Sequence, residues 1–230
     1  MTSARDAILA SLAATRPAFA PRTQRFEIPP MPADPVGVLR ARVEAAGGRL
    51  DVVPPDDWVS RIEWPVELAA GTGPTDGPSI HSALPAVASR GSGRLAPGDA
   101  PFTALDLCVL RGEFAVVENG AVWHVPRHPL ERRAALLAEH LVVVIEGDAL
   151  VANLHRAYER IDLGALAFGW FLCGPSKTAD IEQALVLGAH GPRSMRLVWL
   201  TDAATRATIE AAALPESKTS PTPATPRQVS

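Results

Sequence analysis

The sequence has 230 residues, of which 47% are hydrophobic and 20% are charged, a composition typical of a folded globular chain. Its formal net charge of -3 leaves no basic excess with which to hold a polyanion, so we expect no nucleic-acid partner. Its two cysteines, Cys108 and Cys173, form no Cys-x-x-Cys pair. We therefore expect this chain to bind no four-cysteine iron–sulfur cluster and no zinc on its own.

The sequence contains no export or membrane signal of the usual kind. The longest apolar stretch, residues 165–173, is far short of the roughly 20 residues that a membrane-spanning helix needs. The first residues contain no continuous apolar core of a signal peptide. These features predict a cytoplasmic protein without a membrane span.

The N-terminal part is predicted to be an arm that precedes the main domain. Ser3 can cap a helix over residues 3–15, which Pro17 ends. A proline-rich segment then leads to Asp34-Pro35, a cap followed by proline at the first position of a second helix. The predicted divisions are an N-terminal helix and arm (1–35), a main domain (36–214) and a disordered tail (215–230) that is rich in Pro, Ser and Thr.

From residue 49 onward, apolar runs alternate with segments of helical character. The alternation predicts an α/β fold, a parallel-rich sheet with helices on both faces. In such sheets ligands gather beyond the carboxyl ends of the strands, which directs attention to the turns that follow them. The predicted strands are 49–53, 105–110, 114–117, 121–125, 141–145, 167–173 and 196–200, and the predicted helices are 58–68, 130–137, 148–160 and 178–187.

The first candidate motif is Glu118-Asn119-Gly120, between two apolar runs. Asn-Gly in this position is a strong signal of a β-hairpin. A carboxylate at a strand end can act as a nucleophile or general base. The same residues also fit a solvated hairpin turn with no catalytic role, and both interpretations remain open.

The second candidate runs from Gly174 to the start of the helix predicted at 178–187. Ser176, Lys177 and Thr178 would surround the helix N-terminus, whose free N–H groups favour a small carboxylate or a phosphate. Simple capping by Ser176 or Thr178 explains the residues equally well. Asp180 would repel a dianion, so the site favours a monoanion.

The third candidate is Gly188-Ala-His190-Gly191-Pro192, a predicted loop before the last strand. His190 is an acid/base candidate there, although an exposed or core-anchoring histidine fits the same pattern. His124 and His128 have the spacing of two metal ligands on a helix, but the prolines between and after them prevent that helix. We therefore predict no metal site, and we interpret the cysteines in apolar strands as inert thiols.

The order of these motifs resembles that of the lactate-utilisation (LUD) domain, and specifically the lactate-utilisation protein C family. The resemblance covers about residues 36–201, and residues 174–182 and 188–192 are its most specific parts. It implies a fold like that of CoA transferases and ribose-5-phosphate isomerase. It also implies oxidation of L-lactate to pyruvate together with iron–sulfur partner proteins that carry the clusters, and hence a small 2-hydroxy or 2-keto acid as ligand.

The chain departs from the family at one turn, where Glu118-Asn-Gly-Ala121 stands in place of Glu-Thr-Gly-Thr and the hydroxyls are lost. The same three residues resemble the motif around the nucleophilic glutamate of CoA transferases, an alternative function that would use Glu118 covalently. A non-catalytic scaffold for the partners is the third possibility. The predicted site is one cleft at the carboxyl edge of the sheet, with Glu118 and His190 as catalytic residues and with these anion-binding residues: Asn119, Gly120, Gly174, Ser176, Lys177, Thr178, Asp180 and Gly191.

Overall fold

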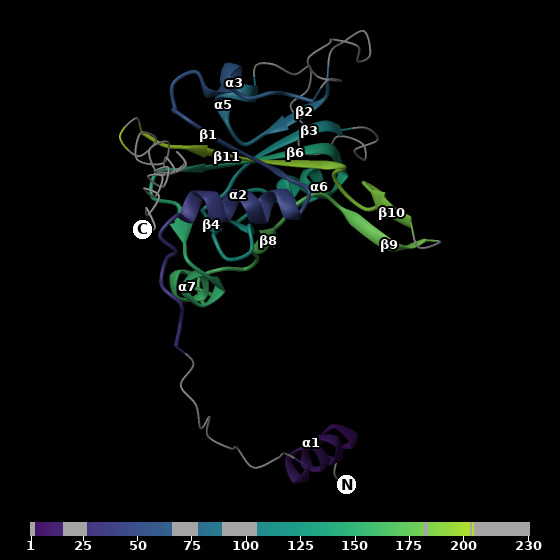
Figure 1. The fold of residues 1–230 in the computed structure, drawn as a ribbon. Coiled ribbons are helices and arrows are strands. Elements are labelled where there is room, and N and C mark those ends of the chain that lie inside the picture. Colours follow the sequence, from purple (N-terminus) through teal and green to yellow (C-terminus); the bar gives the residue numbers. More distant parts are fainter. Residues whose placement is uncertain are drawn as a thin grey trace, which may run out of the picture.

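The computed structural model describes residues 3–15, 27–65, 78–88, 105–181, 184–202 and 204. Its centre is a five-stranded sheet in the order β1-β11-β6-β3-β2, in which every neighbouring pair is parallel (Figure 1). The strands are β1 (Arg49–Val53), β11 (Ser194–Leu200), β6 (Ala138–Glu146), β3 (Leu105–Arg111) and β2 (Ile80–Ser82). The parallel-rich α/β sheet predicted from the sequence is confirmed.

Both faces of the central sheet are covered. Alternate residues of each strand point to opposite faces, so Cys108 and Leu110 belong to one apolar core, and Leu107 and Val109 belong to the other. Two short helices, α3 (Trp58–Arg61) and α5 (Pro85–Ala88), cover one face, and α2 (Pro35–Ala45) and α6 (Pro129–Leu137) lie on the other (Figure 1). Strands that are buried on both faces contain continuous apolar runs, as β6 does over residues 141–145.

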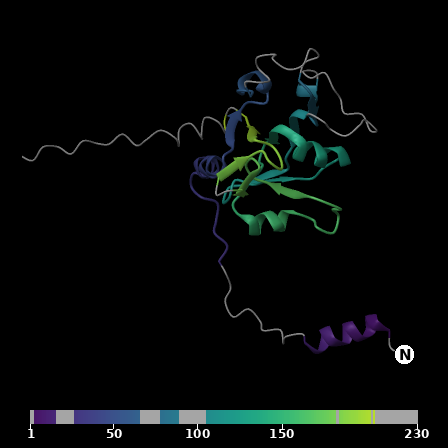
Figure 2. The same ribbon diagram turned by 90° about the vertical axis from the view of Figure 1, so that its right-hand side faces the viewer.

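A second, four-stranded sheet lies beyond α2 and α6, in the order β7-β4-β5-β8. Figure 2 shows the same order of layers from the side, ending at α7 (Leu154–Arg160). The antiparallel pair β4–β5 confirms the predicted hairpin, in which Gly120 has a φ of 76° and Asn119 Oδ1 accepts a hydrogen bond from the Ala121 N–H at 3.0 Å. The strands are β7 (Leu150–Val151), β4 (Phe114–Val116), β5 (Val122–His124) and β8 (Trp170–Leu172).

The two N-terminal helices form where the sequence predicts them. In α1 (Ala4–Ala14), Ser3 and Asp6 form a reciprocal capping box, and no residue of the helix is buried. In α2 the Asp34 carboxylate accepts a hydrogen bond from the Gly37 N–H at 2.8 Å, and Pro35 occupies the first turn. The predicted domain boundaries remain predictions, and the proposed tail, 215–230, lies outside the described residues.

The prediction of a helix over residues 178–187 is wrong. This segment is an antiparallel ribbon of two strands, β9 (Lys177–Ile181) and β10 (Ala184–Leu187), which projects from the side of the molecule (Figure 1). The residues are good helix formers, but local preference is a weak force compared with tertiary contacts. Here the Ser176 N–H donates to the Pro192 carbonyl at 2.8 Å, and the Gly188 N–H donates to the Ser176 carbonyl at 3.0 Å. These bonds bring the two ends of the segment together as a hairpin.

Two other predicted helices are shorter than expected. The helix predicted over 148–160 begins at Leu154, because Leu150 and Val151 pair with β4 instead, and Asn153 caps the helix through a hydrogen bond from the Arg156 N–H. The helix predicted over 58–68 spans Trp58–Arg61, and residues 66–68 lie outside the described residues.

Candidate functional site

The segment that contains Gly174, Ser176 and Gly191 lies at the amino edge of the central sheet, and not at its carboxyl edge as predicted. Ser176 is bonded to Pro192, two residues before β11 begins, and the Arg193 N–H donates to the Glu139 carbonyl near the start of β6 at 2.9 Å. The reason is topological. The residues that precede a parallel strand lie at its amino end, and the segment 174–193 leads directly into β11.

Several of these residues are held there by close packing against the C-terminal end of α2. A Cβ on Gly174 would lie 2.4 Å from the Ala46 carbonyl oxygen, and a Cβ on Gly120 would lie 3.0 Å from the backbone nitrogen of Val43. A Cβ on Gly191 would lie 3.1 Å from the Cβ atom of Ser176. The absence of a side chain at these glycines therefore lets three turns approach their neighbours. Their packing therefore favours glycine whether or not a ligand binds.

The Glu118 carboxylate has a structural partner. Its Oε2 atom accepts a hydrogen bond from the Leu154 N–H at 3.1 Å, so Glu118 supports the N-terminus of α7 from a neighbouring turn. In the same turn the Cys173 thiol donates a hydrogen bond to the Asn119 carbonyl, with 3.4 Å between sulfur and oxygen. Asn119 therefore lies beside Cys173, the residue before Gly174. The Glu118 side chain, in contrast, points to the start of α7.

The remaining predicted residues do not form the predicted cleft. Thr178 pairs in register with Val186 in the β9–β10 ribbon, and Asp180 belongs to β9, so no helix N-terminus exists there to bind an anion. His190 is exposed in the loop before β11. Within the described residues no hydrogen bond or ion pair joins Glu118 or His190 to Ser176, Lys177 or Thr178. A role of these side chains in function stays a prediction.

A pocket of about 270 Å³ opens at the amino edge of the sheet, on the face covered by α3; we call it the amino-edge pocket. Lys177 lies beside it, because its Nζ atom is 3.2 Å from the position of a Cβ on Gly47, which lines the pocket. The lining residues come from the starts of β1, β6 and β11 and from the segment after α3. They are Gly47, Arg49, Glu63, Trp64, Pro65, His140, Leu141, Val142, Ser194, Met195 and Arg196.

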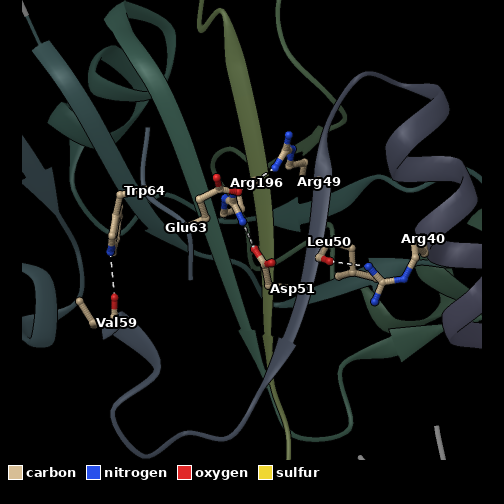
Figure 3. A network of polar contacts seen from close by, with 8 residues as sticks. All are labelled: Arg40, Arg49, Leu50, Asp51, Val59, Glu63, Trp64 and Arg196. Atoms are coloured by element: carbon tan, nitrogen blue, oxygen red, sulfur yellow. Dashed lines mark hydrogen bonds and ion pairs between the residues drawn. The ribbon is translucent and has the colours of Figure 1, made fainter. Parts of the chain in front are cut away.

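Ion pairs line one wall of the amino-edge pocket (Figure 3). Arg196 pairs with Asp51 of the neighbouring strand, and the two side chains are 14% and 27% exposed. Glu63 Oε2 lies 2.9 Å from Arg49 Nη1 and 4.0 Å from Arg196 Nη2, so one carboxylate oxygen is shared by two guanidinium groups. The Arg49 and Glu63 side chains are 69% and 76% exposed. Arg196–Asp51 is therefore the fixed pair, and Glu63 is held loosely.

A histidine and a hydroxyl form another part of the pocket. His140 is buried, and its Nδ1 atom lies 2.7 Å from Ser194 Oγ, its partner in register on β11. Trp64 is oriented by a hydrogen bond from its indole N–H to the Val59 carbonyl at 2.8 Å. These residues were not among those predicted from the sequence, although a charged residue within an apolar strand, such as Asp51 or Arg196, was an available signal.

A second group of titratable residues lies under α6. His124 Nδ1 donates to the Arg111 carbonyl at 2.8 Å, which leaves Nε2 facing Glu131 Oε2 at 3.7 Å. Burial lowers the pKa of His124, and the nearby Glu131 carboxylate partly opposes this; burial likewise lowers the pKa of His81. In the described part of the chain, no three His, Cys, Asp or Glu side chains are arranged to hold a metal ion.

Among the described residues no helix is both long and apolar enough to span a bilayer.

Comparison with proteins of known sequence relates the chain to one group. It is 27% identical to lactate utilization protein C of Geobacillus kaustophilus over 184 residues, which is 74% of this chain and 70% of the relative. The corresponding protein of Geobacillus thermodenitrificans is 27% identical over 180 residues, 72% of this chain and 68% of the relative. That of Shouchella clausii is 32% identical over 92 residues, 38% of this chain and 40% of the relative.

The fold has a counterpart among solved structures. A DUF162 family protein from Deinococcus radiodurans superposes with a TM-score of 0.53 at 17% identity, over 73% of this chain and 97% of that one. This similarity supports the α/β architecture described above. The family profile of the LUD domain matches residues 100–200, which contain β3 to β8, the β9–β10 ribbon and β11. Residues 100–200 are thus similar to the LUD domain family, and the chain as a whole is similar to proteins named lactate utilization protein C.

Proposed function

We propose that this chain is a component of a system that oxidises L-lactate to pyruvate, and that it acts together with iron–sulfur partner proteins. The observation that carries the proposal is the match to proteins named lactate utilization protein C over about seven tenths of both chains. Because the match extends over 184 residues, it concerns most of the chain and not a single shared element.

The chemistry of the reaction supports the need for partners. Oxidation of lactate at C2 removes two electrons and two protons, and the electrons require an acceptor. The two cysteines of this chain are a core thiol, Cys108, and an exposed one, Cys173, and they are too few to hold a cluster. In the proposed system the redox centres therefore reside on the partner proteins, and this chain contributes binding or positioning.

The structure favours neither of the two alternative functions. A CoA-transferase mechanism needs the Glu118 carboxylate to attack a substrate, whereas here that carboxylate accepts a hydrogen bond from Leu154 of α7. A pure scaffold would need no ligand pocket, whereas the amino-edge pocket contains two arginines, a buried histidine and a hydroxyl.

The test is reconstitution with candidate iron–sulfur partner proteins from the same host. A deletion strain should lose growth on L-lactate and recover it when the chain is supplied in trans, while growth on pyruvate stays unchanged. Purified without oxygen, the partners should show L-lactate-dependent bleaching of their cluster absorbance only when this chain is present. Normal growth of the deletion strain on L-lactate, or full bleaching without the chain, would overturn the proposal.

A further inference from the structure

We propose that the amino-edge pocket binds a small monocarboxylate between Arg49 and Arg196, and that Glu63 occupies the position of the ligand carboxylate when the pocket is empty of ligand. The geometry alone supports a carboxylate as the class of ligand. The narrower assignment to a 2-hydroxy or 2-oxo acid, such as lactate or pyruvate, rests on the proposed function.

The position of Glu63 is the first argument. Its Oε2 atom lies between two guanidinium groups, at 2.9 Å from Arg49 and 4.0 Å from Arg196 (Figure 3). The longer distance exceeds that of a hydrogen bond, so the Nη2 atom of Arg196 has only a weak partner in Glu63. A free carboxylate can approach both groups and form charge-assisted bonds with each. Because Glu63 is 76% exposed, it can leave at little cost.

The charges around the pocket give the second argument. Arg49 and Arg196 supply two positive charges, and Asp51 and Glu63 supply two negative ones. Asp51 is fixed beside Arg196 on the neighbouring strand, so it stays when Glu63 moves away. One positive charge is then left without a counterion, which one monoanion neutralises. Lys177 at the rim adds to the attraction of anions, although its exposure to solvent screens this effect.

The other walls fit the rest of a small hydroxy or oxo acid. The His140–Ser194 pair, with 2.7 Å between Nδ1 and Oγ, offers polar atoms to an oxygen on the carbon next to the carboxylate. Trp64, whose ring is fixed by its bond to Val59, and Val142 offer apolar surface to a methyl group. The volume of about 270 Å³ lies just below the usual range for ligand pockets, as suits a molecule of few atoms.

The test is isothermal titration calorimetry of the purified full chain with L-lactate, pyruvate and inorganic phosphate. We expect the two monocarboxylates to bind and phosphate to bind at least tenfold more weakly. Glu63→Gln removes the competing carboxylate and should tighten monocarboxylate binding about two- to fivefold, the range expected for displacing an exposed ion pair. Arg49→Gln, which removes one charge-assisted partner, should weaken binding about tenfold.

The chain offers a matched control on the same edge of the sheet. Glu139 and Arg193 form an ion pair of the same length, 2.9 Å, and neither lines the pocket. Glu139→Gln and Arg193→Gln change the net charge as the two pocket variants do, and they should leave the affinity unchanged. Arg196→Lys keeps a cation beside Asp51 and so protects the fold, but it loses the second nitrogen and should weaken binding.

The proposal is overturned if neither monocarboxylate binds, if phosphate binds as tightly, or if Glu63→Gln and Glu139→Gln have the same effect on affinity. These outcomes are independent of the growth and reconstitution tests. Growth on L-lactate that depends on the chain, combined with no binding of lactate or pyruvate, would refute the pocket and leave the proposed function intact. Binding with the expected variant pattern, combined with normal growth of the deletion strain, would refute the proposed function alone.

Discussion

Gly174 lies so close to the carbonyl oxygen of Ala46 that a Cβ on the glycine would be only 2.4 Å away from it. Its φ of 67° is also in the left-handed region that favours glycine. This contact joins the turn after β8 to the C-terminal end of α2, which leads into β1. The contact therefore connects the second sheet to the edge strand of the central sheet.

We predict that Gly174→Ala destabilises the fold by about 2–4 kcal/mol, about 1 kcal/mol from the backbone conformation and the rest from the forced displacement of Ala46. Gly147→Ala is the matched control. Gly147 has nearly the same φ, 64°, but a Cβ there would have no neighbour within 4 Å. It should cost only about 1 kcal/mol. Urea unfolding of both variants measures the difference, and equal losses of stability would contradict the close contact.

The second prediction concerns Glu118. Glu118→Gln retains an oxygen that can accept the Leu154 N–H, so we expect a stability change below about 0.5 kcal/mol and unimpaired growth on L-lactate. Glu118→Ala removes the acceptor and should cost about 1 kcal/mol. The measurements are thermal unfolding and complementation of the deletion strain. Loss of growth with a stable Glu118→Gln protein would instead establish a catalytic role for this carboxylate.

Local sequence signals predicted the parts of the fold that depend on local physics. The Asn-Gly turn demands a residue with positive φ, and Gly120 supplies it. The Asp34-Pro35 pair suits the start of a helix, and the apolar run at 141–145 suits a strand covered on both faces. In each case the residues involved are neighbours in the chain, so their preferences could be judged together.

The candidate site could not be predicted in the same way. Arg196 meets Asp51 across 145 positions of sequence, and Arg49 meets Glu63 across 14. No local pattern relates such residues until the parallel register of β1 and β11 is known. The expectation of a site at the carboxyl edge failed for a related reason. The ribbon at 177–187 is closed by hydrogen bonds between the residues that flank its two ends, although its own sequence favours a helix.

The third prediction concerns the two thiols. Burial strongly raises the pKa of the fully buried Cys108, so it should resist alkylation in the native state. Cys173 is exposed, and its thiol pKa is raised by partial burial and lowered somewhat by Lys177. Native protein should therefore consume one equivalent of a thiol reagent slowly, at a rate that increases with pH, and a second equivalent only after unfolding. Two equivalents consumed at the same rate in native protein would contradict the buried position of Cys108.

The last prediction is a loss of stability below about pH 6.5. Burial lowers the folded-state pKa of His124 from its usual value of 6.5, more than the nearby Glu131 raises it, and the side chain is almost fully buried. Between the folded pKa and 6.5 the unfolded chain binds a proton that the folded chain does not. Stability therefore falls as pH falls through this window, by at most about 1.4 kcal/mol per pH unit for this histidine.

His81 adds to the same slope, because burial also lowers its pKa. Urea unfolding at several pH values between 7.5 and 5.5 (roughly two units, spanning the histidine range) measures the effect. His124→Gln keeps a donor for the Arg111 carbonyl and should reduce the slope, whatever its effect on stability at neutral pH. A His124→Gln protein with the slope of the parent would show that His124 is protonated equally in both states, contrary to its buried position beside Arg111 and Glu131.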